Sequence, residues 1–111
     1  MQEYNVILTW EAIYDVADIA DYIEAKFGRQ RADRFQEDLQ KQLNNLRYWG
    51  KMFGKTQIFY NNYAVYKKTF SPSIIFYIVE EMKKEIHILR VLREERNWRE
   101  ILSQKRNYTY E

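Results

Sequence analysis

Three arginines, Arg90, Arg93 and Arg96, recur every three residues where an apolar run ends, and two adjacent lysines, Lys67 and Lys68, lie in an earlier run. Cationic side chains of this kind suit phosphate chemistry. RNA cleavage would require a base for the ribose 2′-hydroxyl, a cation beside the scissile phosphate and an acid for the leaving oxygen. Arginine stabilises the phosphorane charge through its bidentate fork, but its pKa is too high for a good general base. A lysine with a pKa depressed by neighbouring cations would have to be the base, and no acid is evident.

Each of these cations also has an ordinary structural alternative. Arg93 and Arg96 can pair with nearby glutamates on a helix surface, which stabilises a protein by only about 0.3–0.5 kcal/mol per pair. Arg90 differs because it interrupts an apolar strand, where a charge must reach solvent or a partner, and this favours a functional role. Lys67 and Lys68 fall on opposite faces of one strand, so at most one of them belongs to any single site.

The chain has no cysteine and only one histidine, His87. The lack of cysteine excludes disulfides, thiolate zinc sites and cysteine nucleophiles, and one histidine cannot make a metal site. We therefore expect no metal and no cofactor. His87 itself is expected to be a half-exposed strand residue.

Length and composition indicate one domain spanning residues 1–111, with 46% hydrophobic residues to form a core. The chain has no apolar run of about 18 residues that could span a bilayer, and Glu3 stands where a signal peptide needs positive charge. We expect a cytoplasmic protein without membrane contact. Residues 1–28 carry six acids against one base, whereas residues 55–111 carry eleven bases against seven acids. A basic C-terminal half predicts an anionic partner, either nucleic acid or an acidic polypeptide.

Hydrophobic periodicity defines the N-terminal half. Thr9 is placed to cap a helix whose apolar stripe begins at Ile13 and which Gly28 ends, and Gly50 ends a second striped helix. Two amphipathic helices with so short a link predict an antiparallel hairpin. The expected elements are a strand at residues 5–9, a helix to residue 27, a link around Arg29-Gln30 and a helix at residues 32–49.

In the C-terminal half the period switches to two, which indicates strands. Residues 74–79 have no polar side chain on either face and are placed in the sheet interior. The expected elements are a loop at 50–57, a short strand around 58–60, strands at 63–70, 74–79 and 85–92, a short helix from Glu94, and a frayed tail at 104–111. The resulting fold class is α+β, with a helical hairpin on one face of the sheet and the other face partly open for binding.

This layout resembles the RelE/ParE toxins of type II toxin–antitoxin systems over residues 4–102. The resemblance is carried by Tyr22-Ile23, residues 32–35, residues 75–79 and above all residues 88–98. It implies a β-α-α-β-β-β order with a short C-terminal helix and a largely antiparallel sheet. It also implies growth inhibition, plasmid stabilisation, and a cognate antitoxin that lays an acidic segment on the toxin in a hetero-oligomer.

The family has two biochemical branches. RelE-type members cut messenger RNA in the ribosomal A site with sheet lysines and arginines and a C-terminal Tyr or His, whereas ParE-type members inhibit DNA gyrase. Lys67 or Lys68, Arg90 and Arg93 match the RelE-type cations, so these four are the catalytic candidates if the chain is a nuclease.

Other positions depart from the RelE-type pattern. Ile74 replaces an arginine at the start of its strand, Asn97-Trp98 stands where a Tyr or His is needed, and Tyr108 and Tyr110 lie in the expected tail. We therefore predict a ParE-like inhibitor of gyrase. The predicted target-binding residues are Arg90, Arg93, Arg96 and Trp98. A RelE-like ribosome-dependent mRNA endonuclease is the alternative, and a detoxified binding module is the second alternative.

Overall fold

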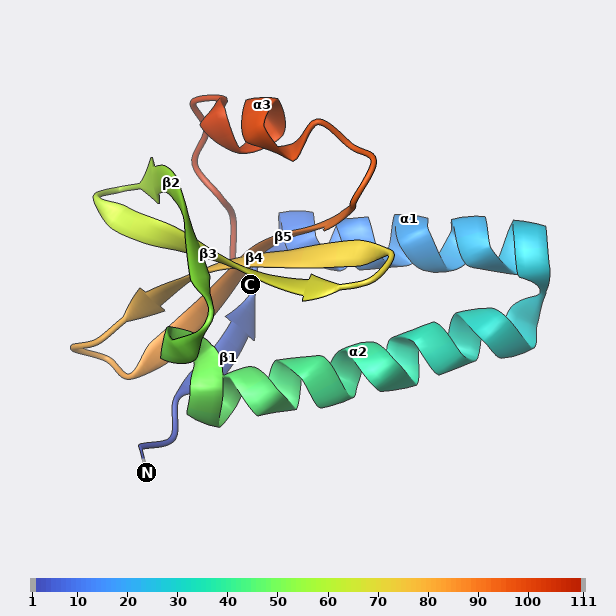
Figure 1. Cartoon of the computed structure of the whole chain (residues 1–111), viewed down its shortest axis with the longest axis horizontal. Helices are drawn as coiled ribbons and strands as arrows, with labels where there is room; N and C mark the ends of the chain where they lie inside the picture. Colours follow the sequence, from blue (N-terminus) through green and yellow to red (C-terminus); the bar gives the residue numbers. More distant parts are fainter. Residues whose placement is uncertain (1, 111) are drawn as a thin grey trace.

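The computed structural model describes residues 2–110 as a five-stranded sheet with helices on both sides (Figure 1). The strand order is β1-β5-β4-β3-β2, and only the β1–β5 pair is parallel. The predicted α+β class with a helical hairpin on one face is confirmed. The elements are β1 (Asn5–Leu8), α1 (Trp10–Phe27), α2 (Arg29–Trp49), the 3₁₀ turn η1 (Gly50–Met52), β2 (Gly54–Tyr60), β3 (Tyr63–Phe70), β4 (Ser73–Glu80), β5 (Glu85–Arg93) and α3 (Trp98–Ser103).

Local signals set the ends of the hairpin helices. The Thr9 hydroxyl accepts a hydrogen bond from the Ala12 N–H at 3.0 Å, as expected of an N-cap. Gly28, with φ of 94°, is the whole link between α1 and α2, because a positive φ reverses the chain in one residue and suits glycine. The predicted link around Arg29-Gln30 is therefore wrong, because the link lies one residue earlier and Arg29 already begins α2.

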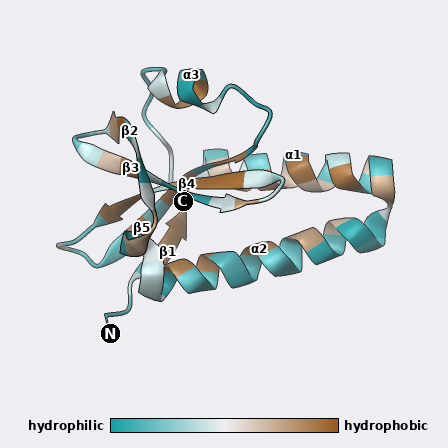
Figure 2. Cartoon of the chain, in the orientation of Figure 1, coloured by the Kyte–Doolittle hydropathy of each residue, from teal (hydrophilic) through white to brown (hydrophobic). Residues whose placement is uncertain are grey.

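The sheet separates two apolar layers. The hairpin packs on one face, where the larger core includes Leu39, Leu46, Tyr77 and Ile88. Strand β4 is central and buried on both faces, as its apolar sequence predicted. In Figure 2 the hydrophobic colour is strongest on β1 and β4, whereas β2 and β3 are paler and much of the outer surface of α2 is hydrophilic.

The second face of the sheet is not left open, contrary to our prediction. Helix α3 and the C-terminal segment cover it, and Phe76, Leu89, Trp98, Leu102 and Tyr108 are buried there. Covering this face removes from water the outward-facing apolar side chains of β4 and β5, which would otherwise form an exposed patch.

Two element boundaries differ from prediction for identifiable reasons. The expected loop at 50–57 contains η1 and most of β2, whose pairing with β3 shifts register between Lys55 and Phe59. Gln57, at φ of 73°, breaks the alternation there and hides the strand from a periodicity search. Helix α3 starts at Trp98 and not at Glu94, because the Glu94 N–H donates to the Pro72 carbonyl and stays with the sheet.

The prediction of a frayed tail is wrong for its last described residues. The Tyr108 N–H donates to the Tyr60 hydroxyl at 3.0 Å, and the Trp10 N–H donates to the Thr109 carbonyl at 2.9 Å. Thr109 also donates to the Glu11 carboxylate through its N–H and its hydroxyl. The tail is thus tied to β2 and to the start of α1, although residue 111 lies outside the described residues.

Candidate functional site

The best-connected cation of the predicted site is Arg90, and its partner is on α1. Its Nε and Nη2 atoms donate to the two carboxylate oxygens of Asp15 at 2.6 and 2.8 Å, a bidentate ion pair. Only 13% of the Arg90 side chain and 11% of the Asp15 side chain are exposed. The hydrogen bond to Asp15 raises the pKa of Arg90 above its usual range, so the guanidinium is charged at every working pH.

The pair is positioned by the way β1 ends. Strand β1 pairs with β5 only as far as Ile88, so the rest of that β5 edge has no strand neighbour. The Thr9 hydroxyl donates to the Leu89 carbonyl at 2.9 Å, and the Asp15 carboxylate accepts the Val91 N–H at 3.0 Å. Asp15 therefore does two tasks, as the acceptor for a strand edge and as the counterion of Arg90. Arg90 meets a partner inside the chain, where our prediction favoured an external one.

The two lysines separate as their adjacency predicted. Lys68 faces α2, donates to the Asn45 side-chain carbonyl at 2.8 Å, and has a pKa lowered by burial. Lys67 is on the α3 face, with Nζ 5.1 Å from the centre of the Trp98 ring. A single substrate phosphate cannot contact both side chains.

The remaining predicted target-binding residues do not form one shared surface. Arg93 packs its guanidinium 3.9 Å from the centre of the Tyr22 ring on the hairpin side and pairs with Glu95. Arg96 is exposed. Trp98 is only 9% exposed and its ring packs on Phe76, so it is mainly a core residue.

The four catalytic candidates are thus divided equally between the two faces of the sheet. Lys67 and Arg90 align with Phe76 between them on the α3 face, and Lys68 and Arg93 lie on the hairpin face. The structure does not bring them to one phosphate.

The tail tyrosines do not supply the missing acid. Burial raises the pKa of Tyr108, although Arg90 and Arg106 act in the opposite direction. Burial also raises the pKa of Tyr110 to about 12. The Tyr110 hydroxyl is engaged with His87 Nδ1 at 2.8 Å, and His87 Nε2 contacts Glu85 at 3.0 Å. A phenol that holds its proton this firmly is poorly matched to acid–base work near neutral pH.

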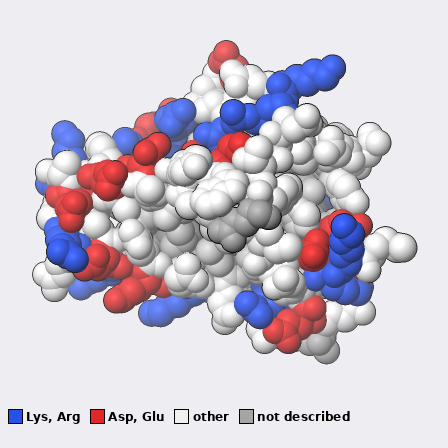
Figure 3. Space-filling model, turned by 180° about the vertical axis from the view of Figure 1, so that it is seen from behind, with Lys and Arg blue, Asp and Glu red and all other residues white. Residues whose placement is uncertain are grey.

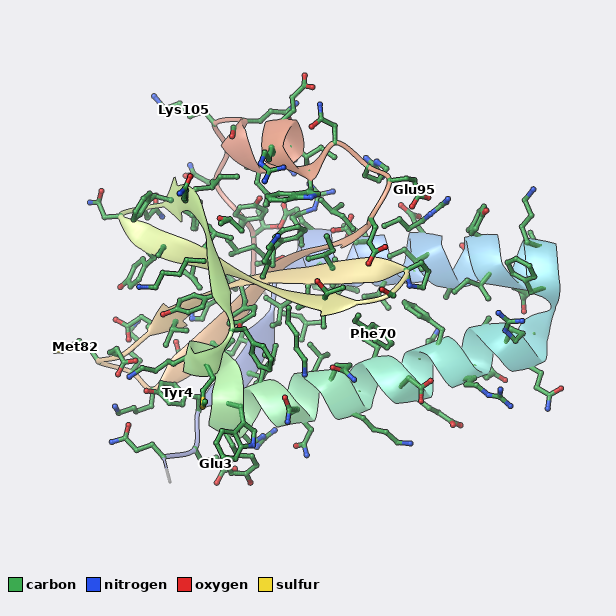
Figure 4. All side chains as sticks on the ribbon, viewed as in Figure 1. Glu3, Tyr4, Phe70, Met82, Glu95 and Lys105 are labelled. Atoms are coloured by element: carbon green, nitrogen blue, oxygen red, sulfur yellow. The ribbon has the colours of Figure 1, made fainter. Side chains whose placement is uncertain are left out.

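A groove on the hairpin face was not predicted from the sequence. It has a volume of about 400 Å³ and lies between the far half of the hairpin and the β3–β4 turn. Three arginines, Arg31, Arg34 and Arg93, stand among its lining residues. Its apolar lining includes Ile19, Tyr22, Ile23, Phe27, Phe35 and Phe70. Phe70 points from the end of β3 towards α2 in Figure 4 and stacks on Phe35 at 5.9 Å between ring centres.

A sequence signal for the groove existed in the helix stripes. Phe27 belongs to the apolar stripe of α1 yet is 57% exposed, and Tyr22 is 38% exposed. The hairpin extends beyond the sheet (Figure 1), so the far ends of both stripes have no strand to cover them. Asp15 gave no such signal, because only the fold brings it to Arg90.

Comparisons with known proteins agree with this architecture. The family model described as "ParE toxin of type II toxin-antitoxin system, parDE" matches residues 6–98. A solved structure of the chromosomal ParDE toxin–antitoxin system from P. aeruginosa is similar, with a TM-score of 0.68 and 22% sequence identity over 82% of this chain and 96% of that chain. A structure of the RelBE2 toxin–antitoxin complex from Mycobacterium tuberculosis has a TM-score of 0.55 and 17% identity over 84% of this chain and 93% of that chain. No curated protein sequence gives a significant match.

Proposed function

Because this chain belongs to the ParE toxin family of type II toxin–antitoxin systems, we propose that it inhibits growth by binding DNA gyrase in the cytoplasm and is neutralised by a cognate antitoxin. The inhibition is by binding and not by cleavage of a substrate.

The observation that carries this proposal is the distribution of the basic residues. Cleavage of RNA needs a base, a cation and an acid around one phosphate. Here Lys67 and Lys68 are on opposite faces of the sheet, and Arg90 is held by Asp15. The arrangement therefore supports a binding toxin over a ribosome-dependent nuclease, which is the alternative within the same superfamily.

The groove supports an antitoxin as the neutralising partner. Its aromatic and aliphatic floor would bury the apolar side of a helix, and Arg31, Arg34 and Arg93 would face acidic residues on the rim of such a segment. Binding of a helix in such a groove requires an apolar side chain in the groove that is exposed in the free toxin and can contact the helix. Phe27, at 57% exposed, is available for that contact.

The experiment is induction of the chain without its partner, followed by assays of supercoiling and translation. We expect growth arrest, and we expect the purified chain to block gyrase supercoiling. Cuts in the ribosomal A site, with supercoiling unaffected, would replace the gyrase proposal with the nuclease alternative. Normal growth with both processes intact would identify a detoxified binding module.

The groove is tested with a matched pair of variants. Phe27→Glu places a charge in the groove, and Phe59→Glu places the same charge on β2, where Phe59 is 66% exposed. We expect Phe27→Glu to weaken antitoxin binding by at least tenfold and Phe59→Glu to leave it unchanged. Equal affinities for the two variants would remove the groove from the proposal.

A further inference from the structure

Five basic residues around α3 form no ion pair among residues 2–110. We call Lys67, Arg96, Arg99, Lys105 and Arg106 the α3 ridge. Arg96, Arg99, Lys105 and Arg106 are exposed, and none of the five is within 4.0 Å of an acidic group among residues 2–110. Seen from behind in Figure 3, Lys and Arg side chains gather along the α3 edge, while acidic side chains follow the neighbouring hairpin.

The glutamates that flank α3 in the sequence are engaged elsewhere. The Glu94 carboxylate accepts from the Ser71 hydroxyl at 2.8 Å, and Glu95 pairs with Arg93 on the hairpin side. The Glu100 carboxylate accepts from the Asn97 side chain at 2.9 Å. Figure 4 shows Glu95 and Lys105 at opposite ends of the α3 segment. On α1, Asp15 and Asp18 line a hollow with Arg96, and Arg106 is near enough to Glu11 to help lower the pKa of that carboxylate. No ridge cation has an acidic group of residues 2–110 within 4.0 Å, so the ridge remains a positive surface.

Two of these cations are held in place by the core. Lys67 Nζ lies 5.1 Å and Arg99 Cζ 4.3 Å from the centre of the Trp98 ring, which itself packs on Phe76 at 5.1 Å. Contacts between a cation and an indole ring favour both side chains individually. Because both cations contact the same ring, their like charges are less than about 10 Å apart, which is within the Debye length at 0.1 M salt, so they repel each other. An anion bound beside Trp98 would be attracted by both charges and would offset their repulsion.

The surface around the α3 ridge excludes two kinds of partner. Trp98, Leu102 and Tyr108 are buried, and residues 93–106, all of which are described, expose no large apolar side chain. A peptide or protein partner needs apolar area at the centre of its interface, and a single-stranded nucleic acid needs exposed aromatic rings for its bases. A polyanion that is recognised only through its charge needs neither apolar area nor exposed aromatic rings.

We propose that the α3 ridge binds the phosphate backbone of duplex DNA, without base readout. The choice of DNA rests on the proposed function, since gyrase holds a DNA duplex. Contact with that duplex would place the toxin on the gyrase–DNA complex through a surface which, apart from Arg96, is separate from the antitoxin groove.

The test is fluorescence anisotropy of a labelled 20-base-pair duplex with the full chain, over a range of salt concentrations. If all five cations contact phosphates, a plot of log K against log salt has a slope of about −4.5, because each contact contributes about −0.9. The double substitution Lys67→Gln with Arg99→Gln should make the slope shallower by about 2. A second double variant, Lys105→Gln with Arg106→Gln, should do the same without touching the Trp98 packing.

The controls separate the possible partners. Lys26→Gln with Lys41→Gln removes the same charge from exposed positions on α1 and α2 and should leave the slope unchanged. Equal slopes for ridge and control variants would overturn the proposal, as would an absence of DNA binding at 50 mM salt. Ridge-dependent binding of polyglutamate without binding of DNA would overturn it too and would identify an acidic polypeptide as the partner.

The outcomes for the ridge and for the gyrase proposal are independent. Supercoiling inhibition by a chain that does not bind DNA would leave the proposed function standing and remove the ridge proposal. DNA binding by a chain that does not inhibit gyrase would support the ridge proposal and remove the proposed function.

Discussion

Removal of the Asp15 carboxylate should damage the fold more than removal of any other acidic side chain of α1. In Asp15→Ala the guanidinium of Arg90, only 13% exposed, loses its counterion, and the Val91 N–H loses its acceptor. Breaking a buried ion pair from one side costs about 3–5 kcal/mol of unfolding free energy. Because the pair keeps some contact with water, we expect the lower end of that range, about 3 kcal/mol.

Asp15→Asn separates the two tasks of this residue. The amide oxygen can still accept the Val91 N–H but cannot neutralise Arg90, so the loss should be smaller than in Asp15→Ala. The difference estimates the backbone contact, for which an unsatisfied buried donor costs about 1–3 kcal/mol. Asp21→Ala, at an exposed position one and a half turns further along α1, is the control and should change stability by less than about 0.5 kcal/mol.

Urea unfolding followed by circular dichroism measures these changes. With a slope of about 1–3 kcal/mol per molar, a loss of 3 kcal/mol lowers the midpoint by roughly 1–3 M. A loss below about 1 kcal/mol for Asp15→Ala, the level of an exposed pair, would refute the reasoning. Arg90 would then be free to meet a target, as the sequence alone suggested.

Three further predictions concern the core, the tail and pH. A Cβ on Gly50 would lie 2.5 Å from Cδ1 of Ile86, a fully buried residue. Gly50→Ala should therefore lower the free energy of unfolding, measured by thermal unfolding, by about 1–3 kcal/mol. Adding Ile86→Val removes the Cδ1 atom and should restore most of the lost stability. Tyr108→Ala should cost about 3 kcal/mol in the same assay, because it empties a buried position against Tyr60. Desolvation raises the pKa of Glu11, but hydrogen bonds from Thr109 outweigh it and leave the pKa below its ordinary value of 4.5. The stabilising contribution of the Glu11 carboxylate is therefore complete above pH 4.5 and is lost as the pH falls through the depressed folded-state pKa. Glu11→Gln should thus make the melting temperature less sensitive to acid. An unchanged dependence of the melting temperature on pH would contradict the Thr109 contact.

The features predicted correctly from the sequence were those encoded by neighbouring residues. Strand β3 has the predicted bounds because its alternation is unbroken, and α1 ends where Gly28 permits a positive φ. Strand β2 was largely missed because Gln57 interrupts its alternation with a left-handed conformation. Local pattern rules cannot distinguish such a strand from a loop.

The features predicted wrongly depend on partners far away in the chain. Arg90 and Asp15 are 75 positions apart, and no periodicity relates them. Thr109 and Glu11 are 98 positions apart, so a polar tail that reads as frayed is in fact tied down. Long-range pairs of this kind decide whether a charged residue serves the fold or remains free for a partner.

The division of the cations between two faces bears on how neutralisation would work. The groove with Arg93 is on the hairpin face, whereas Lys67 of the α3 ridge and the Trp98 ring that it contacts are on the other face of the sheet. Arg96 adjoins the groove, because it lines a neighbouring hollow with Tyr22 and Arg93. A segment seated in the groove would therefore leave the ridge cations other than Arg96 uncovered. If both proposals hold, the antitoxin prevents inhibition by blocking the contact with gyrase and not by displacing DNA, and the neutralised complex should keep most of the affinity of the free toxin for duplex DNA, losing at most the contact made by Arg96.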